Sequence, residues 1–189
     1  MQRLGSELAD AGVTLLQYRN KIGNESEILA DAAILRAVMP NSQVRLILDD
    51  RADLVAQAGF DGVHVDAGDL PPAEARRILG PDRIVGTFGG SSAFLPGVLD
   101  APVDYWAVGP VYRTTTKQTD RVPIGPEGVR KMRELAGPDR VLTCAAGITF
   151  ETAPLVLAAG ASTVAVAAAI FRAADPGAEF RRWKTALGS

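Results

Sequence analysis

The residues best suited to chemistry lie in a short loop that is rich in hydroxyl groups. The run Gly109-Pro110-Val111-Tyr112-Arg113-Thr114-Thr115-Thr116-Lys117 directly follows the strand-like residues 105–108. Threonine hydroxyls donate hydrogen bonds to phosphate oxygens, and the ammonium group of Lys117 supplies the opposite charge. We therefore expect this loop to bind a phosphate or diphosphate. The alternative is a solvated surface loop that is rich in threonine.

A second group of polar residues ends the first predicted strand. In an extended chain Gln17 and Arg19 point to the same side, and Lys21 comes just beyond the strand. One amide and two cations gathered at a strand end favour an anion site. The alternative is a solvated strand end, because most lysine and arginine side chains face water.

Carboxylates follow the next two predicted strands. Asp49 and Asp50 lie at the end of the strand at residues 44–48, and Asp69 follows the strand at residues 61–65. Mg²⁺ is commonly held by one or two carboxylates together with water and substrate phosphate, so this pattern predicts a magnesium site. The alternative role for Asp49 or Asp50 is to cap a following helix, since aspartate is a strong capping residue.

The sequence excludes a zinc site and an intrachain disulfide. His64 is the single histidine and Cys144 the single cysteine, too few for the three nitrogen or sulfur ligands that zinc requires. His64 is expected to be a hydrogen-bonded interior group on its strand. A lone cysteine cannot form an internal disulfide, which fits the reducing cytoplasm.

Small residues occur where two later strands turn into helices. Half of the residues in 145–149 and 166–170 are alanine, and Gly147 is the one glycine. Such residues allow backbone N–H groups at a helix start to approach an anion. Tight packing of helix against strand is the alternative explanation.

These residues are carried by alternating strands and helices. Short apolar runs predict seven strands, at residues 13–17, 44–48, 61–65, 83–87, 103–108, 140–145 and 162–166. Apolar periodicity predicts helices at residues 2–11, 25–39, 73–79, 126–136, 150–159 and 178–187. Short apolar strands that alternate with helices indicate a parallel sheet.

Two architectures fit this alternation, a doubly wound open sheet and a (β/α)₈ TIM barrel. No Gly-x-Gly-x-x-Gly motif follows the first strand, and polar residues gather after the strands, where barrels carry their sites. We therefore predict a single-domain α/β TIM barrel over residues 1–189. Seven strands after an opening helix predict that its first strand is lacking, and the open edges predict a homo-oligomer.

Composition narrows the class of partner. Lysine and arginine number 20 against 22 acidic residues, a net charge of −2 without blocks of like charge, which argues against nucleic acid. No apolar segment reaches the ~18 residues that span a membrane, and the N-terminus is unlike a signal peptide. These observations predict a cytoplasmic protein.

The order of the motifs resembles the thiamine-phosphate synthase family along about residues 7–175. The family consists of TIM barrels that join hydroxymethylpyrimidine diphosphate to thiazole phosphate and release pyrophosphate. The resemblance implies a Mg²⁺-assisted transferase of thiamine biosynthesis that acts on small phosphorylated substrates. It rests on the following elements, taken in order: Gln17-x-Arg19-x-Lys21, Asp49-Asp50-Arg51, Asp61-Gly62-Val63-His64, Gly109-Pro110-Val111-Tyr112-x-Thr114-x-Thr116-Lys117, Gly147-Ile148 and Val164-Ala165-Val166.

The resemblance also implies a role for each motif. Asp50 and Asp69 hold Mg²⁺. The diphosphate is held by Gln17, Arg19 and Lys21, with Asp49 beside them. The thiazole phosphate is held by Thr114, Thr116, Lys117 and Gly147, and by the backbone at Ala167 and Ala168. Arg19, Lys21 and Lys117 are the catalytic cations that neutralise the leaving pyrophosphate.

The chain departs from the family pattern at several positions. Asp49 stands where the family has Asn, and Ala146 replaces the first glycine of Gly-Gly-Ile. Phe88 and Ala168 each stand where the family has Ser. The last two changes favour an alternative, a non-catalytic barrel that binds a phosphorylated ligand.

Two other enzyme activities are weaker alternatives. This chain lacks the acid–base group that a thiazole tautomerase-like activity needs, because Pro110 stands where that family has His. A lysine-based aldolase would require a Schiff base on Lys117.

Overall fold

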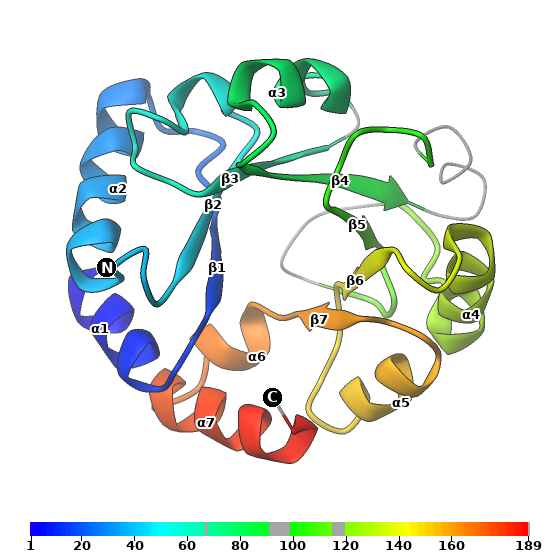
Figure 1. Cartoon of the computed structure of the whole chain (residues 1–189). Helices are drawn as coiled ribbons and strands as arrows, with labels where there is room; N and C mark the ends of the chain where they lie inside the picture. The colour runs from blue at the N-terminus through cyan, green and yellow to red at the C-terminus, as the bar shows by residue number, and fades with distance from the viewer. Residues whose placement is uncertain (67, 91–98, 115–119, 189) are drawn as a thin grey trace. The chain divides into compact units, whose positions relative to one another are not determined.

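The structure is a computed structural model that describes residues 1–66, 68–90, 99–114 and 120–188 (Figure 1). It divides into two compact units, the first formed by Met1–Gly86 with Ala174–Ser189 and the second by Thr87–Ala173. The strands follow one another in chain order from β1 to β7, without the reversal of order that defines a doubly wound sheet. The predicted seven-stranded α/β sheet is therefore confirmed.

The first unit contains Gln17 and the aspartates of the predicted site, which lie in or just after its strands. Its strands are β1 (Leu15–Tyr18), β2 (Arg45–Asp49), β3 (Gly62–Val65) and the start of β4 (Ile84–Gly90). Its helices are α1 (Gln2–Asp10), α2 (Glu25–Val38), the 3₁₀ helix η1 (Ala52–Leu54), α3 (Pro72–Leu79) and α7 (Pro176–Leu187). Helix α1 lies against both α2 and α7 (Figure 1).

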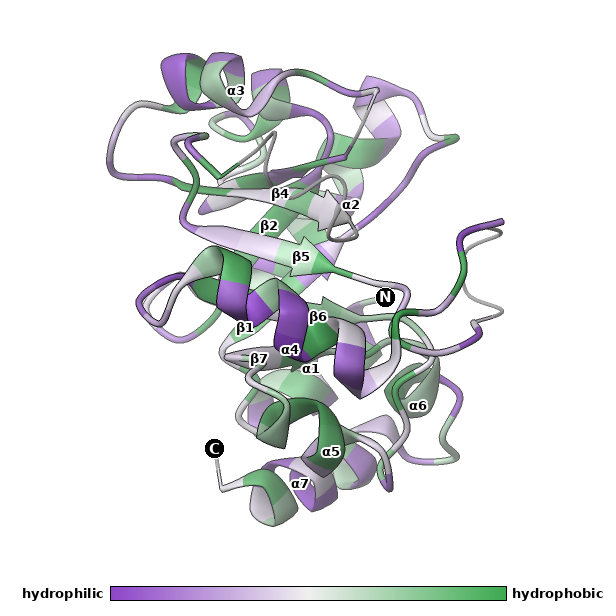
Figure 2. Ribbon diagram, turned by 90° about the vertical axis from the view of Figure 1, so that its right-hand side faces the viewer, coloured by the Kyte–Doolittle hydropathy of each residue, from purple (hydrophilic) through white to green (hydrophobic). Residues whose placement is uncertain are grey.

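The second unit continues the alternation. Its strands are the end of β4, β5 (Tyr105–Val108), β6 (Val141–Ala145) and β7 (Thr163–Ala165). Its helices are α4 (Gly125–Ala136), α5 (Ala153–Ala158) and α6 (Ala168–Phe171). The ribbon of α4 alternates between hydrophilic and hydrophobic residues in Figure 2. Val129, Met132 and Ala136 form its buried face, because residues three and four apart share one side of a helix.

Parallel pairing explains the burial of the central strands. In the first unit β1 pairs with β2, and β2 pairs with β3, all parallel. Leu46, Ile47 and Leu48 of β2 are almost completely inaccessible, as expected for a strand with both faces covered. Strand β1 has no second partner among the described residues, and its Leu15 is 49% exposed.

The helix and strand boundaries lie within a few residues of those predicted from the sequence. Two short elements, η1 and α6, were not predicted, because three or four residues are too few to show apolar periodicity. None of the helices in the described part of the chain combines the length and the apolar character that a bilayer span requires.

An arginine in the last turn of three helices ties the following loop to the next strand. Arg36 of α2 and Arg76 of α3 do so in the first unit, and Arg133 of α4 does so in the second. Each donates through Nη1 to a carbonyl near its own helix end and to a carbonyl at the next strand. The acceptors are Met39 and Val44 for Arg36, Gly80 and Arg83 for Arg76, and Gly137 and Arg140 for Arg133.

In the first unit, Asp61 is the carboxylate that forms an ion pair with one of these arginines, Arg36. Its carboxylate lies 2.7 Å from Arg36 Nη2 and 3.1 Å from Arg45 Nη1, and it accepts a 2.8 Å hydrogen bond from the Leu46 N–H. Burial alone would raise the pKa of Asp61, but the Leu46 N–H and the two guanidinium groups outweigh it and hold the pKa below 3.8.

Replacing Asp61 by asparagine is expected to destabilise the fold in a pH-dependent manner. At pH 7, Asp61→Asn should lower the free energy of unfolding by about 1–3 kcal/mol, because charged hydrogen bonds are lost. The folded pKa is depressed, so the stabilisation is complete above the unfolded pKa and disappears as pH falls through the folded pKa. Urea denaturation of both proteins between pH 7 and pH 2.5 measures this difference.

The control is Asp82→Asn, since Asp82 is exposed and a surface change of this kind alters stability by about 0.5 kcal/mol or less. A difference between wild type and Asp61→Asn that stays constant over this pH range would contradict the assignment.

Candidate functional site

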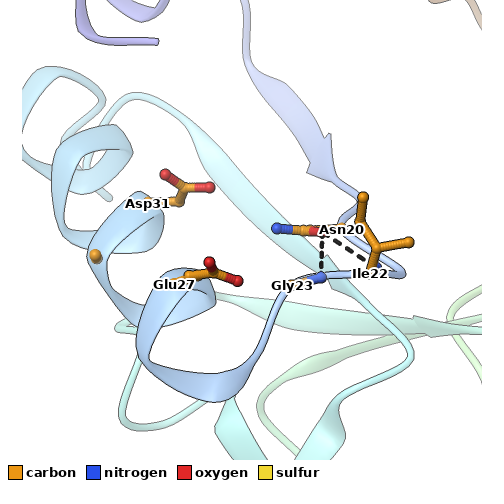
Figure 3. Close-up of a pocket in the computed structure, with 6 residues that line it drawn as sticks. Asn20, Ile22, Gly23, Glu27 and Asp31 are labelled. Carbon is orange, nitrogen blue, oxygen red and sulfur yellow. Dashed lines mark hydrogen bonds between the residues drawn. The ribbon is translucent and has the colours of Figure 1, made fainter.

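Asn20 fixes the loop that follows β1. Its Nδ2 donates to the Tyr18 hydroxyl at 3.1 Å, and that hydroxyl donates to Asp31 Oδ2 at 2.5 Å. Its Oδ1 accepts hydrogen bonds from the backbone N–H groups of Ile22 at 3.3 Å and Gly23 at 2.8 Å (Figure 3). The backbone that carries the two cations of this loop is therefore held from both sides.

A hollow of about 530 Å³ lies beside this loop (Figure 3). Of the described residues, Glu27 and Asp31 contribute carboxylates to its lining, and no lysine or arginine does so. Burial, followed by the hydrogen bond to Asp31, raises the pKa of Tyr18 to about 12, so its hydroxyl stays protonated. The acidic lining of the hollow is thus unfavourable to phosphate and diphosphate, and no sequence pattern indicated this hollow.

Gln17, Arg19 and Lys21 converge on the buried carboxylate of Asp49. Gln17 Nε2 donates to Asp49 Oδ1 at 2.5 Å. Arg19 Nε and Lys21 Nζ lie 3.1 Å and 3.8 Å from Asp49 Oδ2. The Asp49 side chain is only 4% exposed. Alternation along β1 and its pairing with β2 thus bring together the amide and the two cations that the sequence placed at one strand end.

Lys21 also contacts the two aspartates that the sequence assigned to a metal. Its Nζ forms an ion pair with Asp50 Oδ2 and lies 3.6 Å from Asp69 Oδ2. Asp69 is oriented by the Asp66 N–H, which donates to its Oδ2 at 2.9 Å. Carboxylates from the ends of β2 and β3 therefore surround one ammonium group.

Asp50 is held in an unusual environment. Its backbone has a φ of 66°, a left-handed conformation that aspartate tolerates better than most residues. Burial, with a hydrogen bond to Asp69 as the next cause, raises the pKa of Asp50 to about 6. Its Oδ1 is buried and has no hydrogen-bond partner. The capping alternative is wrong, because the residue before η1 is Arg51 and no side chain caps that helix.

The donor set at Asp50 and Asp69 fits a hard divalent cation. Two carboxylates are in contact, and the buried Asp50 Oδ1 has an unused acceptor. Oxygen donors in this number suit Mg²⁺, which takes its remaining ligands from water and substrate. No metal-binding group of three or more His, Cys, Asp or Glu side chains is found among the described residues. A site of this kind would therefore depend on non-protein ligands.

His64 is buried on β3 and lies opposite Asp49 in the register of β2 and β3. Its positive potential lowers the pKa of Asp49, although burial, the largest influence, raises that pKa overall. The histidine thus supports the buried carboxylate from the strand next to it.

In the second unit, the Gly-Pro-Val-Tyr segment extends the pairing of β5 with β6. The N–H groups of Val111 and Tyr112 donate to the carbonyls of Ala145 and Ala146 at 3.0 Å and 3.1 Å. Gly147 has a φ of 68°, and a Cβ there would lie 2.3 Å from the Arg113 carbonyl oxygen. Glycine is therefore required where the two segments meet.

The other residues predicted to bind phosphate are only partly described. Thr114 is half-buried beyond Arg113, whereas Thr116 and Lys117 lie outside the described residues. Ala167 precedes α6 and Ala168 begins it, and α6 has only 4 residues. Thr114 and Gly147 thus come from segments that meet.

Phe88 has a partner that the sequence did not indicate. The guanidinium carbon of Arg121 lies 4.5 Å from the centre of its ring, within the range of a cation–π contact. Arg121 lies beyond the threonine-rich loop and belongs to no recognisable motif, so no sequence signal pointed to it.

Comparison with known proteins decides the family. A family model described as thiamine monophosphate synthase matches residues 2–170. The chain belongs to this family. The thiamine-phosphate synthase of Koribacter versatilis is 42% identical over 168 residues, covering 89% of this chain and 78% of that protein. The enzyme of Agrobacterium fabrum is 39% identical over 167 residues, covering 87% and 76%.

A solved structure of the thiamine monophosphate synthase family agrees. Thiamine phosphate pyrophosphorylase from Pyrococcus furiosus superimposes with a TM-score of 0.88 at 26% identity, covering 99% of this chain and 89% of that one. The resemblance drawn from the ordered motifs is therefore confirmed.

Asn20→Ala is expected to weaken anion binding without unfolding the protein. Loss of its three side-chain hydrogen bonds frees the loop of Arg19 and Lys21, so pyrophosphate affinity in the presence of Mg²⁺ should fall about tenfold, equivalent to ~1.4 kcal/mol. Isothermal titration calorimetry measures the affinity, and circular dichroism checks the fold.

The matched control for this variant is Asn24→Ala. Asn24 caps α2 and forms a capping box with Glu27, so its loss should lower stability by about 1 kcal/mol and leave pyrophosphate affinity unchanged. Equal affinity losses in both variants would show that Asn20 has no special role in binding.

Gly147→Ala is expected to be strongly destabilising, by about 3 kcal/mol or more, because a positive φ and a backbone overlap combine. Gly137→Ala is the control, since Gly137 has a φ of 78° but nothing within 4 Å of its Cβ position. That variant should lose only about 1–2 kcal/mol. Chemical denaturation compares them, and equal losses would disprove the close approach at Gly147.

Proposed function

We propose that this chain is a thiamine-phosphate synthase that joins hydroxymethylpyrimidine diphosphate to thiazole phosphate and releases pyrophosphate. The observation that carries the proposal is the convergence of Gln17, Arg19 and Lys21 with the carboxylates of Asp50 and Asp69 at the ends of β1, β2 and β3. The names of relatives about 40% identical over most of the chain support it.

The first chemical event is the departure of the diphosphate from the pyrimidine methylene carbon. The carbon–oxygen bond breaks, both electrons leave with pyrophosphate, and the pyrimidine ring stabilises the cation that remains. Arg19 and Lys21 are placed to neutralise the charge that builds on the leaving group. Fixed cations of this kind stabilise a transition state without having to reorganise.

Asp50 and Asp69 are the residues that would hold Mg²⁺. When bound, the ion supplies charge stabilisation to the leaving oxygens. Asp49 remains with Gln17 and Arg19, where it orients both side chains toward the diphosphate. The buried Asp49 thereby contributes to binding through its neighbours.

The thiazole phosphate is assigned to the second unit. Thr114, Gly147 and the backbone at Ala167 and Ala168 would hold it, together with Thr116 and Lys117. The close approach of Gly147 to the Arg113 carbonyl supports the assignment, because it places two segments of the set side by side. The thiazole nitrogen then attacks the cation, a step that needs positioning more than a general base.

The remaining parts of the proposal concern the whole protein. We propose a single-domain (β/α)₈ barrel, a cytoplasmic location and a homo-oligomer. The unpaired edge of β1 within the described residues supports association through that strand.

The direct test mixes both substrates with Mg²⁺ and measures pyrophosphate release and thiamine phosphate formation. Arg19→Met is expected to lower kcat/KM by about 10²-fold or more, because a cation at the leaving group is removed. Arg45→Met is the control, since Arg45 pairs with Asp61 and not with this cluster. Absence of both products from folded wild-type protein at any pH tried would reject the function.

One observation favours the second candidate, a non-catalytic binder of phosphorylated ligands. Phe88 stands where the family has a substrate-contacting Ser, and Arg121 covers its ring. For this candidate, thiamine phosphate should raise Tm by mass action while no product forms from the two substrates. Turnover together with stabilisation would exclude it.

A further inference from the structure

We propose that the ammonium group of Lys21 and a divalent cation are alternative partners of the carboxylates of Asp50 and Asp69. Binding of the metal releases Lys21, and the released ammonium group then binds the diphosphate. The inference rests on the proposed function for the identity of the diphosphate. It concerns how the Lys21 side chain couples metal binding at Asp50 and Asp69 to binding of the diphosphate.

The first support is the position of the ammonium group. Lys21 Nζ forms an ion pair with Asp50 and lies 3.6 Å and 3.8 Å from oxygens of Asp69 and Asp49. Of these three contacts, only the one to Asp50 is short enough for a hydrogen bond, and the other two are attractions between opposite charges. Mg²⁺ prefers the same carboxylate oxygens as ligands. Both cations cannot occupy one centre, since like charges repel and the space is shared.

The second support is the balance of charge. Arg19, Lys21 and the positive potential of His64 all act on Asp49. Within the described residues, Lys21 is the one cation paired with both Asp50 and Asp69, so these two carboxylates keep a net negative charge that opposes an incoming diphosphate. A divalent cation reverses the sign, so the anion becomes attractive only when the metal is bound. Metal and diphosphate must then strengthen each other's binding by the same factor.

The third support is that Lys21 can move while its surroundings stay fixed. Its side chain is 32% exposed, against 4% for that of Asp49. Asn20 holds the neighbouring backbone, so the four-carbon stem of the lysine supplies the displacement. Arg19 differs, because its ion pair is with Asp49 and not with Asp50 or Asp69. A metal at Asp50 and Asp69 therefore takes no partner from Arg19.

The test begins with Mn²⁺ alone as the probe, its free concentration being measured by electron paramagnetic resonance. Lys21→Met is expected to bind Mn²⁺ at least tenfold more tightly than wild type, because the competing ammonium group is gone. Arg19→Met is the matched control and should change the affinity by less than about threefold, since Arg19 does not contact the metal-binding pair. Unchanged or weaker Mn²⁺ binding by Lys21→Met overturns the proposal.

A second measurement uses the wild-type chain, so it does not depend on a variant that folds. The chain has four lysines, and mass spectrometry resolves acetylation at each. Mg²⁺ should raise the acetylation rate of Lys21 several-fold relative to the exposed Lys131, because displacement frees its amine. An equal or lower relative rate overturns the proposal.

The two hypotheses fail separately. Suppose that the Mn²⁺ affinity of Lys21→Met and the acetylation rate of Lys21 change as expected, but no pyrophosphate is released from the two substrates. The proposed function is then rejected, and the exchange of Lys21 for a metal at Asp50 and Asp69 stands. If turnover occurs while Lys21→Met shows no gain in Mn²⁺ affinity, only the exchange is rejected.

Discussion

The site depends on the buried carboxylate of Asp49. A charge that is removed from water must be paired and hydrogen-bonded, or it destabilises the fold. At the end of β2, Gln17 donates a hydrogen bond to Asp49 Oδ1, while Arg19 and Lys21 form ion pairs with Oδ2, which has no hydrogen-bond partner. The side chains that we propose for binding the diphosphate are thereby oriented by an internal anion.

The neighbouring strands turn this requirement into a defined geometry. The parallel register of β1, β2 and β3 sets the relative positions of Gln17, Asp49 and His64 along the strand direction. The left-handed backbone at Asp50 then directs the next carboxylate away from the strand, toward Lys21 and Asp69. The carboxylates of the cluster consequently lie at two depths. Asp49 is buried, whereas Asp50 and Asp69 are more exposed.

Much of this arrangement could be predicted from the sequence, because it follows from the two-residue period of side chains along a strand and from the order of the strands in the chain. Alternation placed Gln17 and Arg19 on one side, and strand ends placed Asp49, Asp50 and Asp69 together. The partners of individual side chains could not be predicted. The contact of Lys21 with the carboxylates and that of Arg121 with Phe88 depend on rotamers and long-range packing. The requirement for glycine at position 147 likewise arises from a segment more than thirty residues earlier in the chain.

The arginines at the helix ends have a consequence for how such a protein can diverge. Arg36 and Arg76 in the first unit, and Arg133 in the second, anchor the loops that lead into strands. The site that we propose lies toward the opposite ends of such strands. A change there, such as one at Phe88 in the later part of β4, leaves these anchors untouched. Selection can therefore alter the ligand preference of such a chain stepwise, while the architecture beneath it is inherited intact.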